Sequence, residues 1–244
     1  DLEPIVQELA NEYLTEQGIT ILNNVTLESV SNDGDKPVIT ANNQNYTFDA
    51  VLYATGRKAN TANIGLEHTD IATNERGAIV VNDTCESSVP GVYAVGDVNG
   101  GPQFTYISLD DFRIVFGALT GNSQYTLKDR KNIPYTTFLT PPLSRVGLTE
   151  EDAINQGYTV KTKEMLVATM PRAHVNDYLK GAFKIVVDAD NDLILGATLY
   201  SQGAEELINL IKMAMDNNIP YTYFKNQIFT HPTMAENLND LCNF

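Results

Sequence analysis

Two short apolar runs, each followed by a glycine, constrain the fold of this chain more than any other feature. Residues 50–54 (AVLYA) and 91–95 (GVYAV) are continuously apolar, and Gly56 and Gly96 follow them closely. Such a run is typical of a strand that is buried on both faces of a sheet. In open α/β sheets, ligands bind beyond the carboxyl ends of such strands. The runs therefore predict an α/β region with a ligand site near these glycines.

Helical and strand periodicity alternate around these runs. Apolar side chains at helical spacing predict helices over residues 4–17 and near 104–120. Short β-rich runs predict further strands, at residues 19–22, 26–30, 38–41, 46–48 and 76–83. The polar residues 121–133 have no period, and we interpret them as a linker.

The pattern changes after residue 134. Strands are predicted at residues 135–139, 144–148, 159–167, 182–188 and 193–200, with a hairpin turn at 190–192. Helices are predicted at 149–156, at 203–217 and from Thr233 onward, and the apolar 203–217 helix should be well buried. Strands joined by hairpins and followed by helices indicate an α+β domain.

Composition excludes several classes of function. Asp and Glu number 31 against 16 Lys and Arg, so the net charge of -15 disfavours nucleic acid and anionic membrane surfaces as partners. No apolar run approaches the ~20 residues of a membrane helix, and the N-terminus lacks the basic region of a signal peptide. Cys85 and Cys242 lie far apart, which excludes a disulfide framework and a cysteine metal site. We predict a cytoplasmic protein that binds no metal.

The string at residues 91–111 (GVYAVGDVNGGPQFTYISLDD) is the first candidate site. It places Asp97 just beyond an apolar run, where a carboxylate can accept hydrogen bonds from sugar hydroxyls. Gly100 and Gly101 keep the next loop slim, and a helix starting near Thr105 would aim its N–H groups at an anionic ligand. For Gly96 and Asp97 taken alone, a simple turn is the favoured interpretation, whereas the whole 21-residue string favours a ligand site.

The string FTHPTMAENLND at residues 229–240 is the second candidate site. Pro232 keeps His231 out of helical geometry. Thr233 and Glu236 have the spacing of a capping box, so a helix should begin there. A histidine with a carboxylate five residues later can also form an oriented acid/base pair. Both interpretations of Glu236 can hold, because a carboxylate has two oxygens.

Three strings, in this order, resemble the flavoprotein disulfide reductases, also called class I pyridine nucleotide-disulfide oxidoreductases. ATGRKAN at 54–60 is similar to the family's ATGRxPN, SSVPGVYAVGDV at 87–98 to its second flavin motif, and FTHPTMAE at 229–236 to its HPTxxE. Ala59 replaces the usual proline of the first motif. TPPLSRVGLTEEDA at 140–153 further resembles a bacterial branch linked to reactive-chlorine and hypothiocyanite defence.

The resemblance also implies parts that this sequence does not contain. The family has two GxGxxG motifs and a close redox-active cysteine pair, and neither occurs here. The chain is therefore expected to be a C-terminal half: a partial NAD(P)-binding domain (1–55), a partial FAD-binding domain (56–130) and a dimerisation domain (134–244). The implied fold is a partial Rossmann-like α/β region followed by an α+β dimerisation domain.

Site roles follow from the resemblance at matching positions only. Asp97, next to Gly96, corresponds to the aspartate that binds the flavin's ribityl chain, and Thr105 and Tyr106 to the helix start facing the flavin. His231 corresponds to the acid/base that serves the dithiol of the other subunit, oriented by Glu236. The parent enzyme would pass hydride from NAD(P)H through FAD to the cysteine pair. The resemblance implies a homodimer that acts on a small disulfide-like or oxidant substrate. Mercuric reductases usually lack this histidine, so its presence favours the disulfide-like substrate.

Two alternatives stay open at this point. The chain could be a non-catalytic dimerisation module with an incomplete flavin site, because both phosphate-binding loops are absent. The longer protein could also be a peroxidase-type relative with a single redox cysteine. We expect the isolated chain to bind FAD weakly or not at all, and to be inactive.

Overall fold

The computed structural model describes residues 2–244, which divide into two compact units. Unit 1 comprises residues 2–22 together with Lys131–Phe244, and unit 2 comprises Asn23–Arg130. The first helix of the chain therefore packs with its C-terminal part, and the residues between them form unit 2.

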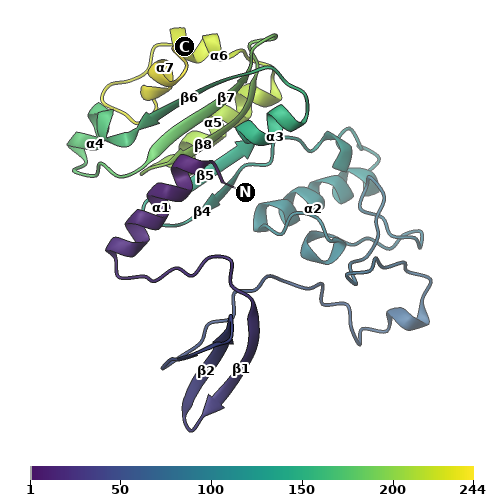
Figure 1. Cartoon of the computed structure of the whole chain (residues 1–244). Helices are drawn as coiled ribbons and strands as arrows, with labels where there is room; N and C mark the ends of the chain where they lie inside the picture. The colour runs from purple at the N-terminus through teal and green to yellow at the C-terminus, as the bar shows by residue number, and fades with distance from the viewer. Residues whose placement is uncertain (1) are drawn as a thin grey trace. The chain divides into compact units, whose positions relative to one another are not determined.

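Unit 1 is built on a five-stranded antiparallel sheet (Figure 1). Its strands are β4 (Tyr135–Thr137), β5 (Leu143–Gly147), β6 (Val160–Leu166), β7 (Ala182–Asp188) and β8 (Ile194–Tyr200), in the spatial order β4-β5-β8-β7-β6. Every residue of the seven-residue β7 is buried. The predicted hairpin joins β7 to β8, and Asp192 adopts the left-handed φ of 59° that is common in tight turns.

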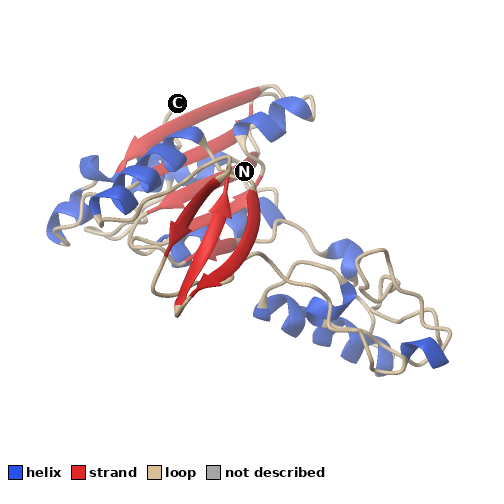
Figure 2. Cartoon of the chain, turned by 60° about the horizontal axis from the view of Figure 1, so that its bottom comes forward, coloured by secondary structure: helices blue, strands red, loops and turns tan. Residues whose placement is uncertain are grey.

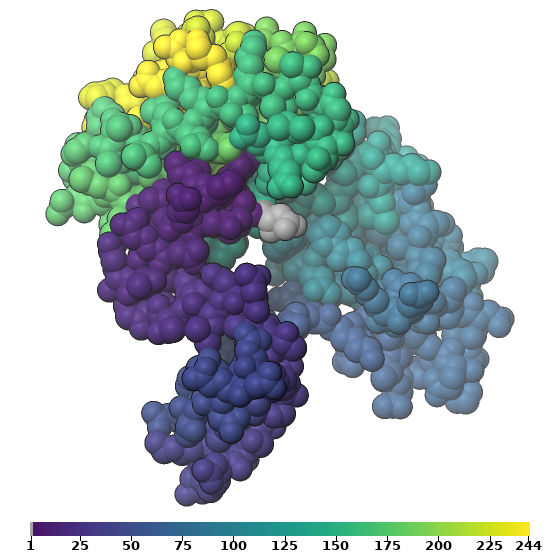
Figure 3. Space-filling model, viewed as in Figure 1, coloured from purple at the N-terminus to yellow at the C-terminus, as the bar shows by residue number. Residues whose placement is uncertain are grey.

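Helices cover both faces of this sheet. One face packs against α5 (Ala204–Asp216), α6 (Tyr221–Asn226) and α7 (Asn237–Leu241), in a core that includes Phe183, Leu199 and Ile211. The other face packs against α1 (Pro4–Glu16), whose Val6 and Tyr13 contact Leu143 and Tyr200. Leu199 and Tyr200 point to opposite faces because side chains alternate along a strand. Figure 3 shows α1, in purple, seated against the green residues of the sheet.

A buried ionic cluster also fastens the start of α1 to the sheet. Lys184 of β7 lies 2.9 Å from a carboxylate oxygen of Glu3, 2.6 Å from Glu150 and 3.1 Å from Glu164. The Lys184 and Glu3 side chains are only 5% and 3% exposed. Burial alone would lower the pKa of Lys184, but the hydrogen bonds that its ammonium group donates to Glu150, Glu3 and Glu164 outweigh burial and raise that pKa.

Shorter elements complete unit 1. Helices α3 (Glu150–Asn155) and α4 (Pro171–Val175) and the 3-10 turn η4 (Val167–Thr169) occupy the connections around β6. The capping box that starts α3 forms, since the Thr149 hydroxyl accepts from the Asp152 N–H and the Asp152 carboxylate accepts from the Thr149 N–H.

Unit 2 contains a small sheet, one long helix and short 3-10 turns. Strands β1 (Leu27–Asp33), β2 (Lys36–Ala41) and β3 (Gln44–Thr47) form an antiparallel meander, drawn in red in Figure 2. All seven residues of β1 are exposed. Helix α2 (Thr105–Leu119) follows the turn η2 (Gly96–Asn99), and η1 (Leu66–His68) and η3 (Leu127–Asp129) lie in the loops.

The predicted strands at 19–22, 50–54, 76–83 and 91–95 are wrong. Residues 76–83 and 91–95 form only isolated bridges, and neither 19–22 nor 50–54 pairs with any other segment of the described residues. Leu52 is 89% exposed and Tyr53 66%. A strand forms only where a neighbour satisfies its backbone groups, and residues 2–244 supply none beside 50–54.

The other predicted helices and strands are confirmed, with small shifts of their ends. Two further expectations, the burial of the 203–217 helix and the linker at 121–133, hold only in part. Helix α5 matches the prediction for 203–217 but is buried along one face only, because Met213 is 56% exposed. The predicted linker at 121–133 holds the short turn η3. Sequence patterns also missed α4 and α6, which are five and six residues long and lack the side-chain cap that marks the start of the equally short α3.

Candidate functional site

The first candidate site is the turn between α6 and α7, which presents His231. The His231 Nδ1 atom lies 2.8 Å from the Glu236 Oε2 atom. The other carboxylate oxygen of Glu236, Oε1, accepts a hydrogen bond of 3.1 Å from the Thr233 N–H. The two predicted interpretations of Glu236 thus coexist, with one oxygen facing the imidazole and one holding the backbone.

Exposure and charge distinguish the two members of this pair. The His231 side chain is 69% exposed, whereas that of Glu236 is 19% exposed. The hydrogen bond with His231, assisted by the Thr233 N–H, lowers the pKa of the Glu236 carboxyl. Glu236 is therefore ionised at neutral pH and accepts from Nδ1–H, which leaves the exposed Nε2 of a neutral imidazole free to take a proton.

The helix predicted to start at Thr233 begins four residues later, at Asn237. The reciprocal bonds of a capping box do form, since the Thr233 hydroxyl accepts from the Glu236 N–H at 3.2 Å. The N–H groups of Asn237, Leu238 and Asn239 then bond to carbonyls three residues back. The box therefore closes a tighter turn before the α-helix, because i→i+3 bonds are common at helix starts.

The second candidate site is in unit 2, around the turn η2. Asp97 is half-exposed and pairs with Arg57, whose Nη1 lies 3.3 Å from the Asp97 Oδ2 atom. The same Arg57 nitrogen donates to the carbonyl of Gln103 at 3.0 Å. Arg57 thereby connects the ATGRKAN string to the start of α2, so the first two predicted motifs meet in one place.

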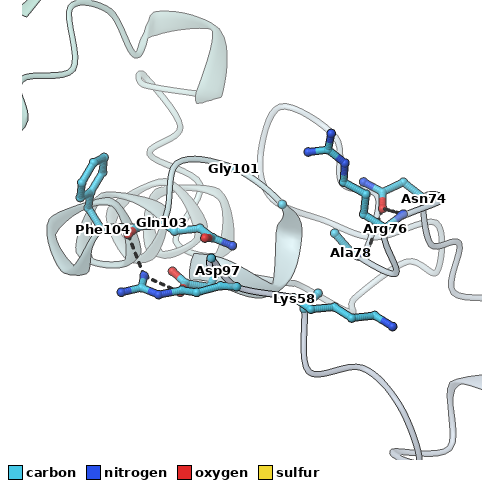
Figure 4. A pocket seen from close by; sticks show the side chains of 12 residues that line it. Lys58, Asn74, Arg76, Ala78, Asp97, Gly101, Gln103 and Phe104 are labelled. Carbon is cyan, nitrogen blue, oxygen red and sulfur yellow. Dashed lines mark hydrogen bonds and ion pairs between the residues drawn. The ribbon is translucent and has the colours of Figure 1, made fainter. Parts of the chain in front are cut away.

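These residues line a hollow of about 1020 Å³, with Asp97 and Gln103 on one side and Asn74, Arg76 and Ala78 on the other (Figure 4). Gly100 lines this hollow, and a Cβ atom there would lie 2.9 Å from the Cβ atom of Ala78, which also lines it. The predicted slimness of this loop is thus a steric requirement at Gly100.

Thr105 and Tyr106 are the first two residues of α2. They follow Gln103 and Phe104, which line the hollow, but Thr105 and Tyr106 do not line it themselves. The Tyr106 ring stacks on Phe104 with the ring centroids 5.0 Å apart. Burial raises the pKa of the Tyr106 hydroxyl. The predicted helix start is therefore adjacent to the Asp97 turn.

Sequence reasoning missed the residue that holds the η2 turn. Asp111 is fully buried, and its Oδ2 atom accepts from the Gly96 N–H at 2.7 Å and from the Asn99 side chain at 2.9 Å. Its Oδ1 atom pairs with Arg130, which also contacts Asp110 at 2.7 Å. Adjacent aspartates at the sixth and seventh positions of α2 are typical of an exposed helix face, and only the fold shows Asp111 to be buried.

The two cysteines offer no redox pair. Cys85 in unit 2 and Cys242 in unit 1 are both free and buried. Burial raises the pKa of the Cys85 thiol to about 11 and that of Cys242 to about 12, so neither thiolate forms at neutral pH. Within residues 2–244, no group of three or more His, Cys, Asp or Glu side chains gathers as a metal site would require.

Two family models match the chain. The model for pyridine nucleotide-disulphide oxidoreductases matches residues 1–111, and the model for the dimerisation domain of these enzymes matches residues 133–242. The chain belongs to the pyridine nucleotide-disulphide oxidoreductase family. These matches confirm the resemblance and the predicted fold class, a nucleotide-binding region followed by a dimerisation domain.

Individual relatives agree. RclA, a probable pyridine nucleotide-disulfide oxidoreductase of Escherichia coli, is 44% identical over 228 residues, which are 93% of this chain and 52% of the relative. A mercuric reductase of Staphylococcus aureus is 34% identical over 240 residues, 97% of this chain and 44% of that enzyme. The solved structure of the HOCl-induced flavoprotein disulfide reductase RclA from Escherichia coli has a TM-score of 0.93 at 42% identity, covering 98% of this chain and 55% of that one.

The chain thus spans about half the length of the curated relatives that it matches. Among residues 2–244, no helix combines the length and apolar character needed to cross a membrane.

Proposed function

We propose that this chain is part of an FAD- and NAD(P)H-dependent disulfide-type oxidoreductase, in which His231 is the acid/base. The hydrogen bond of 2.8 Å between His231 and Glu236 is the observation that carries the proposal. Glu236 keeps the proton of the neutral imidazole on Nδ1. The exposed Nε2 atom can then take the proton of an approaching thiol and return it to a leaving thiol.

The thiols would come from a redox cysteine pair outside these 244 residues. A thiol with a reference pKa of about 8.5 attacks a disulfide only as thiolate, so a neighbouring base increases its reactivity. Family membership supports a homodimer, in which His231 would serve the cysteine pair of the other subunit, and a small disulfide-like or oxidant substrate. The greater identity to RclA than to the mercuric reductase, 44% against 34%, favours the reactive-chlorine-defence branch.

The residues around η2 fit the part of FAD that the resemblance assigns to them. Asp97 is half-exposed and lines the hollow, with its Oδ2 atom engaged by Arg57. Its other carboxylate oxygen would accept a hydrogen bond from a ribityl hydroxyl. A Cβ atom at Gly100 would narrow this hollow. When bound, FAD would relay hydride between NAD(P)H and the disulfide. Asp97 would hold the ribityl chain, and the start of α2 at Thr105 and Tyr106 would face the flavin ring.

We further propose the domain limits implied by the resemblance: residues 1–55 from an NAD(P)-binding domain, 56–130 from an FAD-binding domain and 134–244 as the dimerisation domain. For the chain by itself we propose weak or no FAD binding, because neither GxGxxG phosphate-binding loop of the family occurs in this sequence. This observation favours the dimerisation-module alternative for the isolated chain. A purified chain that is yellow, with flavin absorbance, would contradict it.

The test of the acid/base role uses His231→Gln in the longer enzyme. We expect turnover to fall by about 10²–10⁴-fold, the usual contribution of a general acid/base, while the flavin spectrum is kept.

His68→Gln is the matched control, because His68 also lies near a glutamate, with its Nε2 atom 3.6 Å from Glu67. Full activity of His231→Gln would overturn the assignment. A cysteine count in the longer enzyme separates a cysteine pair from the peroxidase-type alternative.

A further inference from the structure

The segment that leads into His231 is held by the helix that follows the His231–Glu236 pair. The Asn239 side chain of α7 points its Nδ2 atom at three main-chain carbonyls, at 2.6 Å from Phe224, 2.9 Å from Gln227 and 3.3 Å from Lys225. All three partners are acceptors, so the NH₂ group must face them. Two N–H bonds are thus shared among three carbonyls.

These carbonyls belong to the end of α6. The last four carbonyls of a helix have no partner within it, and side chains or water must satisfy them. Here one amide from α7 does so while half-buried. Asn239 therefore joins the C-terminal end of α6 to the middle of α7, on the two sides of the His231 turn.

Three residues separate this contact from His231. Of them, Phe229 packs on the core, with its ring stacked on Phe224 at a centroid distance of 6.5 Å. Ile228 is 95% exposed, and the carbonyl of Thr230 accepts from the Thr233 hydroxyl at 2.7 Å. Asn239 fixes the entry of this segment, and the Thr233 turn fixes its exit.

We propose that Asn239 is a positioning residue for the His231–Glu236 pair. It acts through residues 224–230, which set where the His231 backbone lies relative to the start of α7. Without these hydrogen bonds the entry to His231 loosens, and the Nδ1–Oε2 contact of 2.8 Å is populated less. The catalytic meaning of this inference rests on the proposed function, whereas its geometry can be tested on the 244-residue chain.

The experiment reads the proton position on the neutral His231 imidazole by nitrogen NMR. Donation to Glu236 requires the proton on Nδ1, whereas a free imidazole side chain favours Nε2. We expect Asn239→Ala to lower the ratio of the Nδ1–H form to the Nε2–H form about fivefold, the effect of losing about one hydrogen bond's net contribution.

Asn217→Ala is the matched control, because the Asn217 side chain also donates to a helix carbonyl, that of Met213 at 2.8 Å. It should leave the ratio unchanged. Asn239→Asp keeps the shape and removes the donor, and should lower the ratio at least as much as Asn239→Ala. An unchanged ratio in both folded Asn239 variants, or an equal shift in Asn217→Ala, overturns the proposal.

Unfolding of both Asn239 variants would also overturn it, because Asn239 would then serve the fold of unit 1 as a whole. The outcome is separate from that of the proposed function. Full turnover of His231→Gln would refute the catalytic role of His231. It would not affect the change in proton position that we expect in the Asn239 variants.

Discussion

Unit 1 and unit 2 use apolar residues differently. In unit 1, β7 is buried along its whole length and lies between two layers of helices. In unit 2, all of β1 is exposed, and Leu109, Phe112 and Phe116 on α2 are more than half exposed. The His231–Glu236 pair thus belongs to a unit with a well-packed hydrophobic core, whereas the Asp97 turn depends on hydrogen bonds and ion pairs. Local polar networks can hold a turn where a packed sheet does not.

The largest expected effect tests the core directly. Phe183→Ala, at a fully buried site in β7, should destabilise unit 1 by about 3–5 kcal/mol. Phe116→Ala, at a 57% exposed site in α2, should change stability by less than about 0.5 kcal/mol. Urea denaturation followed by the amide signals of β7 and α2 measures both. Equal losses of stability in Phe183→Ala and Phe116→Ala would contradict the difference in packing between the two units.

The next effect concerns the ionic cluster under α1. Lys184→Met leaves the buried Glu3 carboxylate without its cation, and should cost about 3 kcal/mol near neutral pH. The exposed pair of Lys36 and Asp49 supplies the control, and Lys36→Met should cost less than about 1 kcal/mol. Equal costs for the two variants would remove burial as the cause.

Alkaline pH tests the same cluster without a mutation. The pKa of Lys184 is raised in the folded protein, so its stabilising contribution is complete below the unfolded pKa of about 10.4. It is lost as pH rises through the folded value. The stability difference between the wild type and Lys184→Met should therefore shrink only above about pH 10.4, as measured by urea denaturation. A difference that disappears near neutral pH would contradict the assignment.

A smaller effect is expected at the turn that presents Asp97. Asp111→Asn removes the charge that binds Arg130 and weakens the acceptor for the Gly96 N–H, so unit 2 should lose about 2 kcal/mol. Hydrogen exchange at the Gly96 amide should accelerate. Asp110→Asn, at a carboxylate that is 19% exposed, is the control and should leave Gly96 protected. Unaltered exchange in Asp111→Asn would mean that another contact holds the turn.

The smallest effect is the acid dependence of the His231 turn. Because the pKa of Glu236 is lowered in the folded protein, its contribution is present above the unfolded pKa of about 4.3 and lost as pH falls through the folded value. Glu236→Gln should flatten the loss of stability between about pH 5 and pH 2, by less than about 1 kcal/mol. The exposed Glu206→Gln should not. An identical acid profile in Glu236→Gln would count against the pair.

The sequence predicted much of unit 1 because its signals are local. β-rich runs on either side of a hairpin turn defined β7 and β8, and T-x-x-E spacing brought Thr233 and Glu236 into reciprocal contact. Motif resemblance was needed to connect residues 54–60 with Asp97, which meet through Arg57.

The other features depend on contacts between residues far apart in the sequence, which local patterns do not encode. The apolar run at 50–54 indicates what a strand there would bury, but a strand also depends on neighbours, and residues 2–244 place none beside it. Asp111 and Asn239 look like ordinary surface residues of helices. Their roles depend on which loop comes to lie opposite, Gly96 in one case and Gln227 in the other.

The most direct test of the central claim separates the two half-reactions of the longer enzyme by stopped-flow spectroscopy. In His231→Gln, reduction of the flavin by NAD(P)H should keep its rate, because His231 is assigned to thiol chemistry and not to hydride transfer. Reoxidation by a disulfide substrate should slow by about 10²–10⁴-fold and lose the pH dependence of its acid/base step. Reoxidation at the wild-type rate, with an unchanged pH profile, would contradict the role of the His231–Glu236 pair.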